Sequence, residues 1–178
     1  GPGLGQGEWG RGLFEAVLAS DKSRVCDADA LNLLARASQR LHEADVITPH
    51  PGEAARLLDI ETRDVQRDRF AAAAALCERY GAAVVLKGAG SIVATADAVP
   101  AVICAGNPGM AVGGMGDLLT GCIAALLAQG FDAPDAATAG ALLHASAGDA
   151  AARVDGERGL LPSDLLPWLR RLANPMRR

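Results

Sequence analysis

The chain of 178 residues is long enough for one domain with a sizeable core, and half of its residues are apolar. Alanine and glycine are abundant and aromatic residues are scarce, which suits helices packed closely on a sheet and argues against disorder. A formal net charge of −4 gives no sign of a general nucleic-acid-binding surface. No apolar stretch reaches membrane-spanning length and no signal peptide is visible, so we expect a cytoplasmic protein without a membrane partner.

Cysteine usage agrees with that compartment. Cys26, Cys77, Cys104 and Cys122 show none of the close spacings of a metal site or a redox pair, and each lies in an apolar run. We therefore expect buried, reduced thiols. The basic residues at the C-terminus are interpreted as a solvated tail: Arg170, Arg171, Arg177 and Arg178.

Short β-type runs alternate with longer helical patterns along the chain. The expected strands are Arg24–Cys26, Asp45–Thr48, Ala83–Lys87, Ser91–Thr95 and Val99–Ala105. The expected helices are Ala28–Leu41, Pro51–Leu58, Asp64–Arg79, Asp117–Gln129 and Ala136–Val154. The alternation predicts one α/β domain over residues 1–178, with a doubly wound, mostly parallel sheet and helices on both faces. The last two strands lie close enough in sequence to form an antiparallel hairpin.

The segment Ala105–Gly121, AGNPGMAVGGMGDLLTG, contains five glycines ahead of an apolar helix. Clustered glycines let the backbone approach a ligand and expose amide groups, and the helix dipole adds positive potential at the same point. Phosphate is the natural occupant. Asp117 sits beside this anion site, where it could accept a proton from a hydroxyl that attacks a phosphoryl group. It could equally be the helix N-cap, and its position leaves the two interpretations open.

Two further loops follow strands. VVLKGAGS (Val84–Ser91) places Lys87 where it could neutralise a phosphate, although the Walker A pattern is absent and the segment could be an ordinary turn. In ITPHPGE (Ile47–Glu53), two prolines hold His50 in a defined direction, which favours a substrate contact over a metal site. Glu53 could serve only the helix dipole.

The chain opens on another backbone-exposing turn, GPGLGQ, with no strand before it, which predicts that the domain is N-terminally incomplete. DADALN follows the first expected strand. In that segment Asp29 could cap the next helix, while Asp27 or Asn32 could face the site or hold its loops.

Together these segments resemble the NAD(P)H-hydrate dehydratase family, which forms the C-terminal domain of many bacterial bifunctional repair proteins. The matching pieces occur in family order: GPGLGQ, DADALNLLA, TPHPGEAARLL, VVLKGAG and GNPGMAVGGMGDLLTG. The GxGD element alone would indicate only the ribokinase-like superfamily. The resemblance implies a ribokinase-like fold that lacks its N-terminal strands, and it implies that the fused epimerase domain of bifunctional relatives is absent.

The resemblance also implies a hydro-lyase that restores NADH or NADPH from its S-hydrate with ADP, or ATP, as the phosphoryl donor. Phosphorylation of the ring hydroxyl would create a leaving group, and elimination of phosphate would restore the ring double bond. Asp117 would deprotonate the hydroxyl, the Gly113–Gly116 amides would stabilise the transferring phosphoryl group, and Mg²⁺ would share its charge.

Position by position, the family's hydrate contacts fall on Gly3, His50 and Asp117, and no residue is assigned as a metal ligand. Its adenine-nucleotide contacts fall on Lys87, Gly88, Ala89, Gly90, Ser91 and Gly116. Val112 stands where the family is expected to carry a small hydroxyl residue. The family often forms homo-oligomers, for which the Ala-rich helices offer an interface. Two alternatives are compatible with the same loops: a kinase for a vitamin alcohol, and a nucleotide-binding fragment without catalysis.

Overall fold

Five short strands form one sheet in the order β1–β2–β3–β4–β5 within the computed structural model, which describes residues 1, 3–37 and 39–174. Their bounds are β1 Val25–Cys26, β2 Val46–Ile47, β3 Ala83–Leu86, β4 Ser91–Ala94 and β5 Ala101–Ile103. The β1–β2 and β2–β3 pairs are parallel, whereas β4 is antiparallel to both β3 and β5. All strands except β4 therefore run in one direction, so the expected mostly parallel sheet and its hairpin are confirmed.

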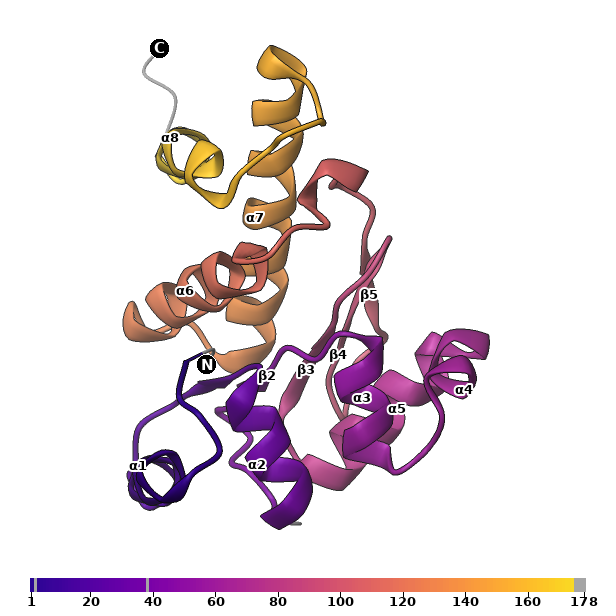
Figure 1. The fold of residues 1–178 in the computed structure, drawn as a ribbon, viewed down its shortest axis with the longest axis vertical. Helices are drawn as coiled ribbons and strands as arrows, with labels where there is room; N and C mark the ends of the chain where they lie inside the picture. Colours follow the sequence, from indigo (N-terminus) through magenta and orange to yellow (C-terminus); the bar gives the residue numbers. More distant parts are fainter. Residues whose placement is uncertain (2, 38, 175–178) are drawn as a thin grey trace.

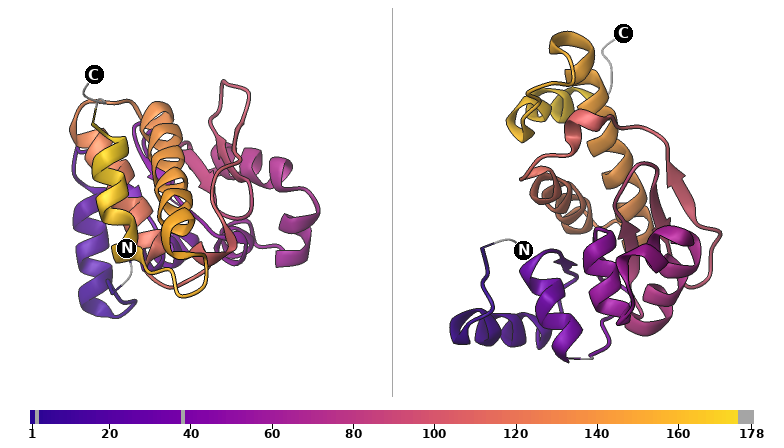
Figure 2. Two further views of the ribbon diagram at one scale, coloured as in Figure 1. Left: turned by 90° about the horizontal axis from the view of Figure 1, so that it is seen from above. Right: turned by 45° about the vertical axis from the view of Figure 1, so that its right-hand side comes forward.

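Helices cover the first face of the sheet. They are α1 (Glu8–Leu18), α2 (Asp29–Ala37), α3 (Pro51–Leu58), α4 (Thr62–Arg67) and α5 (Arg69–Tyr80). Leu34, Leu57 and Leu76 from these helices are fully buried in one core with Val84 and Leu86 of β3. Figure 1 shows α2, α3 and α5 together on this side of the sheet, and Figure 2 shows α1 at the outer edge of the molecule beside α2.

The second face is covered by two long helices, α6 (Met115–Ala128) and α7 (Ala133–Asp155), with α8 (Pro162–Leu172) packed on α7. Ala83 and Val85 of β3 belong to this second core because side chains alternate between the faces of a strand. The two helices approach closely at Gly140, where an added Cβ would lie 2.7 Å from Ile123 Cγ1. Small side chains thus determine the spacing of this layer, as the composition predicts.

Several expectations need correction. The stretch expected as one helix over Asp64–Arg79 is two helices, because the chain leaves helical geometry at Asp68, whose carboxylate then caps α5 by accepting from Ala71 N at 2.9 Å. The helices α1 and α8 were not expected, and Arg170 and Arg171 lie in the last turn of α8, not in a tail. Arg177 and Arg178 fall outside the described residues.

The cysteine expectation holds only in part. Cys26 and Cys77 are buried free thiols, and burial raises the pKa of each to about 11. Cys104 is exposed because it follows β5, the edge strand, and Cys122 is half-buried. Among the residues placed in the structure, no helix is both long and apolar enough to cross a membrane.

Candidate active site

A cavity of about 840 Å³ opens at the carboxyl edge of the sheet. His50, Lys87 and Ala105, which follow β2, β3 and β5, belong to its wall. The wall is completed by the glycine-rich segment and by α6 and α7, through Gly106, Asn107, Pro108, Met110, Ala111, Val112, Met115, Gly116, Leu119, Ala141, His144 and Ala145. The volume lies within the usual range for small-molecule sites, and the location is the one expected for a sheet of this class.

A buried cluster of one ammonium and two carboxylates lies at this edge. Lys87 Nζ is 2.7 Å from Asp27 Oδ1 and 3.7 Å from Glu53 Oε2. The side chains of Asp27 and Glu53 are only 3% and 8% exposed, whereas that of Lys87 is 21% exposed. Both carboxylates pair with Lys87 of the cavity wall without belonging to the wall themselves, so Glu53 does more than complement a helix dipole. The ammonium retains solvent access while its two acidic partners orient it.

The glycine-rich loop meets this cluster directly. Gly114, with φ 89°, is the N-cap of α6, and the helix begins at Met115. A Cβ added at Gly116 would lie 3.2 Å from Asp27 Oδ2 and 3.3 Å from Lys87 Nζ, so only glycine lets the first turn of α6 approach the ion pair without displacing it. The amides at this helix start therefore lie beside the lysine ammonium, which favours an anion.

Asp117 occupies the third position of α6, so the alternative that it is the N-cap is wrong. Its side chain is exposed and forms no hydrogen bond or ion pair with the rest of the described chain. Asp117 does not belong to the cavity wall, but it follows Gly116, which does. The carboxylate is thus open to solvent next to the cavity wall.

His50 is exposed, and it also caps α3. Its Nδ1 accepts from Gly52 N at 3.0 Å and Glu53 N at 3.4 Å, and Glu53 Oε2 accepts from His50 N at 2.7 Å. In the neutral ring the proton therefore resides on Nε2, which lies 3.6 Å from Glu53 Oε1. The reciprocal cap orients the imidazole at the cavity wall.

The Lys87–Ser91 turn is held from α5 by Arg69, whose guanidinium donates to Leu86 O at 3.2 Å and to Ala89 O at 2.7 Å. Ser91 Oγ accepts from Gly88 N at 3.3 Å and donates to Gly88 O at 3.1 Å. Gly88 has φ 152°, and a Cβ there would lie 2.9 Å from the Arg69 guanidinium. The turn is thus a fixed structure at the end of β3.

The N-terminal turn is held by Asp29, which accepts from Gly5 N at 2.9 Å and from Gln6 Nε2 at 3.5 Å. Asp29 therefore binds this turn in addition to starting α2. Asn32 accepts a hydrogen bond from Arg56 and so joins α2 to α3. In DADALN, Asp27 thus pairs with Lys87 of the cavity wall, and Asp29 and Asn32 hold neighbouring elements.

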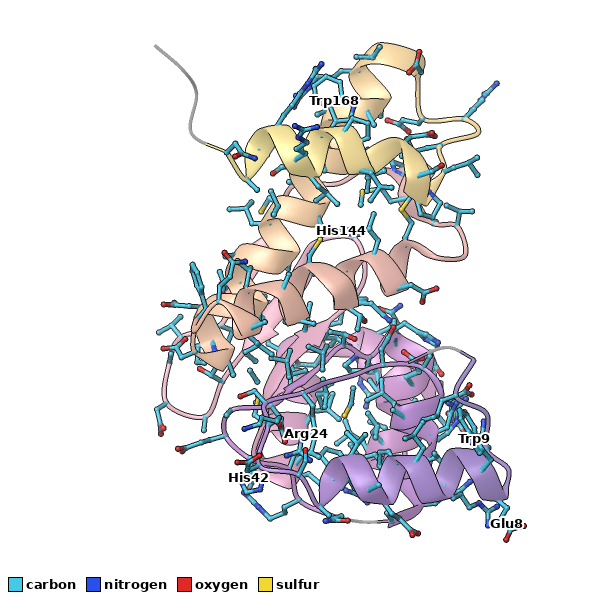
Figure 3. The ribbon with its side chains drawn as sticks, turned by 90° about the vertical axis from the view of Figure 1, so that its left-hand side faces the viewer. Glu8, Trp9, Arg24, His42, His144 and Trp168 are labelled. Carbon is cyan, nitrogen blue, oxygen red and sulfur yellow. The ribbon has the colours of Figure 1, made fainter. Side chains whose placement is uncertain are left out.

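Two side chains of α7 contribute to the site. His144 is only 7% exposed and belongs to the cavity wall, inside the group of helices formed by α6, α7 and α8 (Figure 3). Burial, with a smaller effect of the Lys87 charge, lowers the pKa of His144 to about 4, so the ring is neutral near pH 7. Asp149 accepts from Gly106 N at 2.9 Å and from Asn107 Nδ2 at 3.0 Å.

The structure brings together most of the expected site residues. His50, Lys87, Gly88, Ala89, Ser91 and Gly116 belong to one cavity wall. Gly3, Gly90 and Asp117 do not. Sequence reasoning missed Arg69, Asn107, His144 and Asp149. For Asp149 and His144 a signal existed, since each is an isolated polar residue in an Ala-rich helix.

The donor set is compatible with Mg²⁺, which the fold family implies. Mg²⁺ is usually held by one or two carboxylates together with substrate phosphates and water. Asp27 and Glu53 provide two carboxylates next to the anion loop. No group of three or more metal-ligating side chains occurs in the described part of the chain, so these residues fit a cation only together with a bound phosphate.

The chain is similar to known proteins over almost its whole length. A family model described as NAD(P)H-hydrate dehydratase matches residues 1–171. The bifunctional NAD(P)H-hydrate repair enzyme Nnr of Coxiella burnetii is 52% identical over 176 residues, which cover 98% of this chain and 36% of the relative. The ADP-dependent (S)-NAD(P)H-hydrate dehydratase of Neisseria meningitidis is 42% identical over 181 residues, covering 96% of this chain and 61% of the relative.

A solved structure extends the comparison to three dimensions. The ADP/ATP-dependent NAD(P)H-hydrate dehydratase of Bacillus subtilis, co-crystallized with ATP/Mg²⁺, superimposes with a TM-score of 0.86 at 29% identity. The match covers 97% of this chain and 62% of that chain. The chain therefore spans about a third of the first bifunctional relative and less than two thirds of the single-function proteins.

Proposed function

Because the chain belongs to the NAD(P)H-hydrate dehydratase family, we propose that it carries out nucleotide-dependent dehydration of the S-epimer of NADH or NADPH hydrate, with ADP as the phosphoryl donor. The observation that carries the proposal is the contact of Gly116 with the Lys87–Asp27 pair. It joins a helix-start anion site to a fixed ammonium at the mouth of a cavity of about 840 Å³. The arrangement suits a phosphate chain whose nucleoside enters the cavity.

The nucleotide is proposed to contact the Lys87–Ser91 turn and Gly116. Arg69 holds the carbonyls of the turn, which leaves its glycines available for close backbone contact with the ligand. Apolar side chains of Ile103, Met110 and Leu119 in the cavity wall suit a flat base. The name of the Neisseria relative specifies ADP, which supports the choice of donor.

The hydrate is proposed to lie at the mouth of the cavity, in contact with Gly3, His50 and Asp117. Asp117 removes the proton from the ring hydroxyl as that oxygen attacks the β-phosphorus of ADP, and the bond to the departing AMP breaks. The Gly113–Gly116 amides stabilise the charge on the transferring group. The C–O bond then breaks to release phosphate, and loss of a proton from the neighbouring ring carbon restores the double bond.

Asp27 and Glu53 would hold Mg²⁺ once phosphate is bound, and the ion would supply further neutralisation of phosphate charge. Lys87 already lies between the two carboxylates and keeps them oriented. The buried free thiols of Cys26 and Cys77 support a cytoplasmic location. Homo-oligomeric assembly stays a prediction, since the small residues of α7 are in large part buried within the chain.

The assay is recovery of the reduced-nicotinamide absorbance from NADH hydrate after addition of ADP and Mg²⁺. It is run with this chain and with a version extended to the length of the Neisseria relative. Recovery of NADH with release of AMP and phosphate supports the proposal. A stable phosphorylated alcohol would favour the kinase alternative, and ADP binding without turnover in both versions would favour the non-catalytic one.

A further inference from the structure

The segment between β5 and α6 is fastened to α7 through one carboxylate. Asp149 Oδ2 accepts from Gly106 N at 2.9 Å, and Asp149 Oδ1 accepts from Asn107 Nδ2 at 3.0 Å. Asn107 Oδ1 in turn accepts from Gly109 N at 3.1 Å. A continuous chain of hydrogen bonds thus runs from α7 through the Asn107 side chain to the 3-10 helix Pro108–Met110.

Packing forces the same segment onto α7. A Cβ added at Gly148 would lie 2.3 Å from Met110 Sδ, so the methionine occupies the space that a side chain there would need. A Cβ at Gly109 would lie 2.3 Å from Glu157 O, on the turn after α7. The segment is therefore held between α7 and the Glu157 turn, with Asp149 as the polar attachment.

This attachment matters because the segment is part of the site. Gly106, Asn107, Pro108 and Met110 belong to the cavity wall, and a few residues later the chain forms the anion loop at Gly114–Gly116. A shift of the segment would move this part of the wall. Carboxylates form strong hydrogen bonds with N–H donors, so loss of the Asp149 carboxylate would release the Gly106–Met110 segment from α7.

We propose that Asp149 is a positioning residue that sets the shape of the nucleotide cavity by fixing the Gly106–Met110 segment on α7. The proposal rests on the proposed function, because it takes the cavity to be the nucleotide site. Asp149 acts through Asn107 and two backbone amides, without contact to the ligand. Its contribution is therefore expected in nucleotide affinity, not in the chemical step.

The test exchanges the side chains of Asn107 and Asp149 between the two positions. Asp149→Asn replaces one carboxylate oxygen by an NH₂ group, which then faces an N–H donor of the segment. Asn107→Asp places a second carboxylate against that of Asp149. The double variant Asn107→Asp/Asp149→Asn restores all three hydrogen bonds with one of them reversed in direction. Asp155→Asn is the matched control, because Asp155 is exposed at the end of the same helix and has no side-chain hydrogen bond in the described structure.

ADP affinity is measured by calorimetry in the full chain, KM and kcat by NADH recovery, and the exchange of the Gly106 and Gly109 amides by NMR. We expect about tenfold weaker ADP binding in each single variant, equal to about 1.4 kcal/mol. The double variant should return to within about threefold of wild type, with Asp155→Asn unchanged. The KM for hydrate and kcat should change little, and both amides should exchange faster in the single variants.

Equal ADP affinity in Asp149→Asn and wild type would overturn the proposal, as would a double variant no better than the single ones. If the single variants lose folding stability while their KM for ADP stays at the wild-type value, the role of Asp149 is purely structural and the proposal fails. If wild-type protein binds no ADP, the proposed function fails. The amide exchange rates then still decide whether Asp149 holds the segment.

Discussion

Lys87 and Asp27 form an ion pair of 2.7 Å although they are 60 residues apart in the chain. Each follows a strand, β3 and β1, and the strand between them, β2, leads to Glu53, whose carboxylate lies 3.7 Å from the same ammonium. Three adjacent parallel strands thus deliver one side chain each to a common point. Gly116 of α6 closes the cluster from the other face of the sheet.

Removing the buried acid should destabilise the fold. In Asp27→Asn the Lys87 ammonium loses its strongest partner, and we expect the free energy of unfolding to fall by about 1.5–3 kcal/mol. Urea denaturation measures the change. The matched control is Asp21→Asn, because the Asp21–Lys22 pair is more than four-fifths exposed and such pairs contribute little. Equal effects of the two substitutions would contradict the assigned role of Asp27.

Adding a methyl group at Gly116 should damage the site more than the fold. The Cβ of Gly116→Ala would press on Asp27 Oδ2 and Lys87 Nζ, so we expect kcat/KM to fall by about tenfold or more. Gly121→Ala is the control in the same helix, because a Cβ there meets nothing within 4 Å. The prediction fails if both variants retain wild-type NADH recovery.

His144 should make stability depend on pH. Its folded pKa of about 4 lies below the ordinary value of 6.5, so between these values the unfolded chain binds more protons. The contribution of the neutral ring is therefore complete above about pH 6.5 and is lost as the pH falls toward 4, by at most about 3 kcal/mol. The slope of unfolding free energy against pH should flatten in His144→Gln. If the curves of unfolding free energy against pH for wild type and His144→Gln are parallel, His144 is not the group responsible for the pH dependence.

Helix packing between α6 and α7 should tolerate no side chain at Gly140. Gly140→Ala places a Cβ 2.7 Å from Ile123 Cγ1, and we expect a loss of about 1–3 kcal/mol. Gly121→Ala in α6 should instead stabilise by up to about 1 kcal/mol, because its Cβ meets nothing within 4 Å and alanine favours a helix interior. Thermal unfolding of both variants gives the comparison.

Most of the sheet could be predicted because the local patterns were strong. The strand at Ala83–Leu86 is a run of buried apolar residues, and so is β4 after its first residue, Ser91. Pro51 after a cap at His50 marks the start of α3. The break between α4 and α5 was not predictable from periodicity, since Asp68 reads equally well as a surface position in a continuous helix. In the structure Asp68 is the N-cap of α5 and accepts from Ala71 N, three residues further along the chain.

The candidate site was predictable to the extent that its residues lie in loops after strands. His50, Lys87 and Gly116 carry such signals. Arg69 carries no signal, and Asp149 carries only its polarity within an Ala-rich helix, because each acts from a helix on a carbonyl or amide that is distant in sequence. Only the tertiary arrangement of α5 and α7 brings them to the site.

The most direct test of the account compares wild type with Asp117→Asn in one experiment that follows hydrate-dependent phosphate release, NADH recovery and ADP affinity. Wild-type protein, extended to the length of the Neisseria relative if needed, should release one phosphate for each NADH restored. Asp117→Asn should lose turnover by at least about a hundredfold while retaining ADP affinity, since the carboxylate acts only on the hydroxyl proton. NADH recovery without phosphate release, or near-normal turnover in Asp117→Asn, would contradict the proposed chemistry.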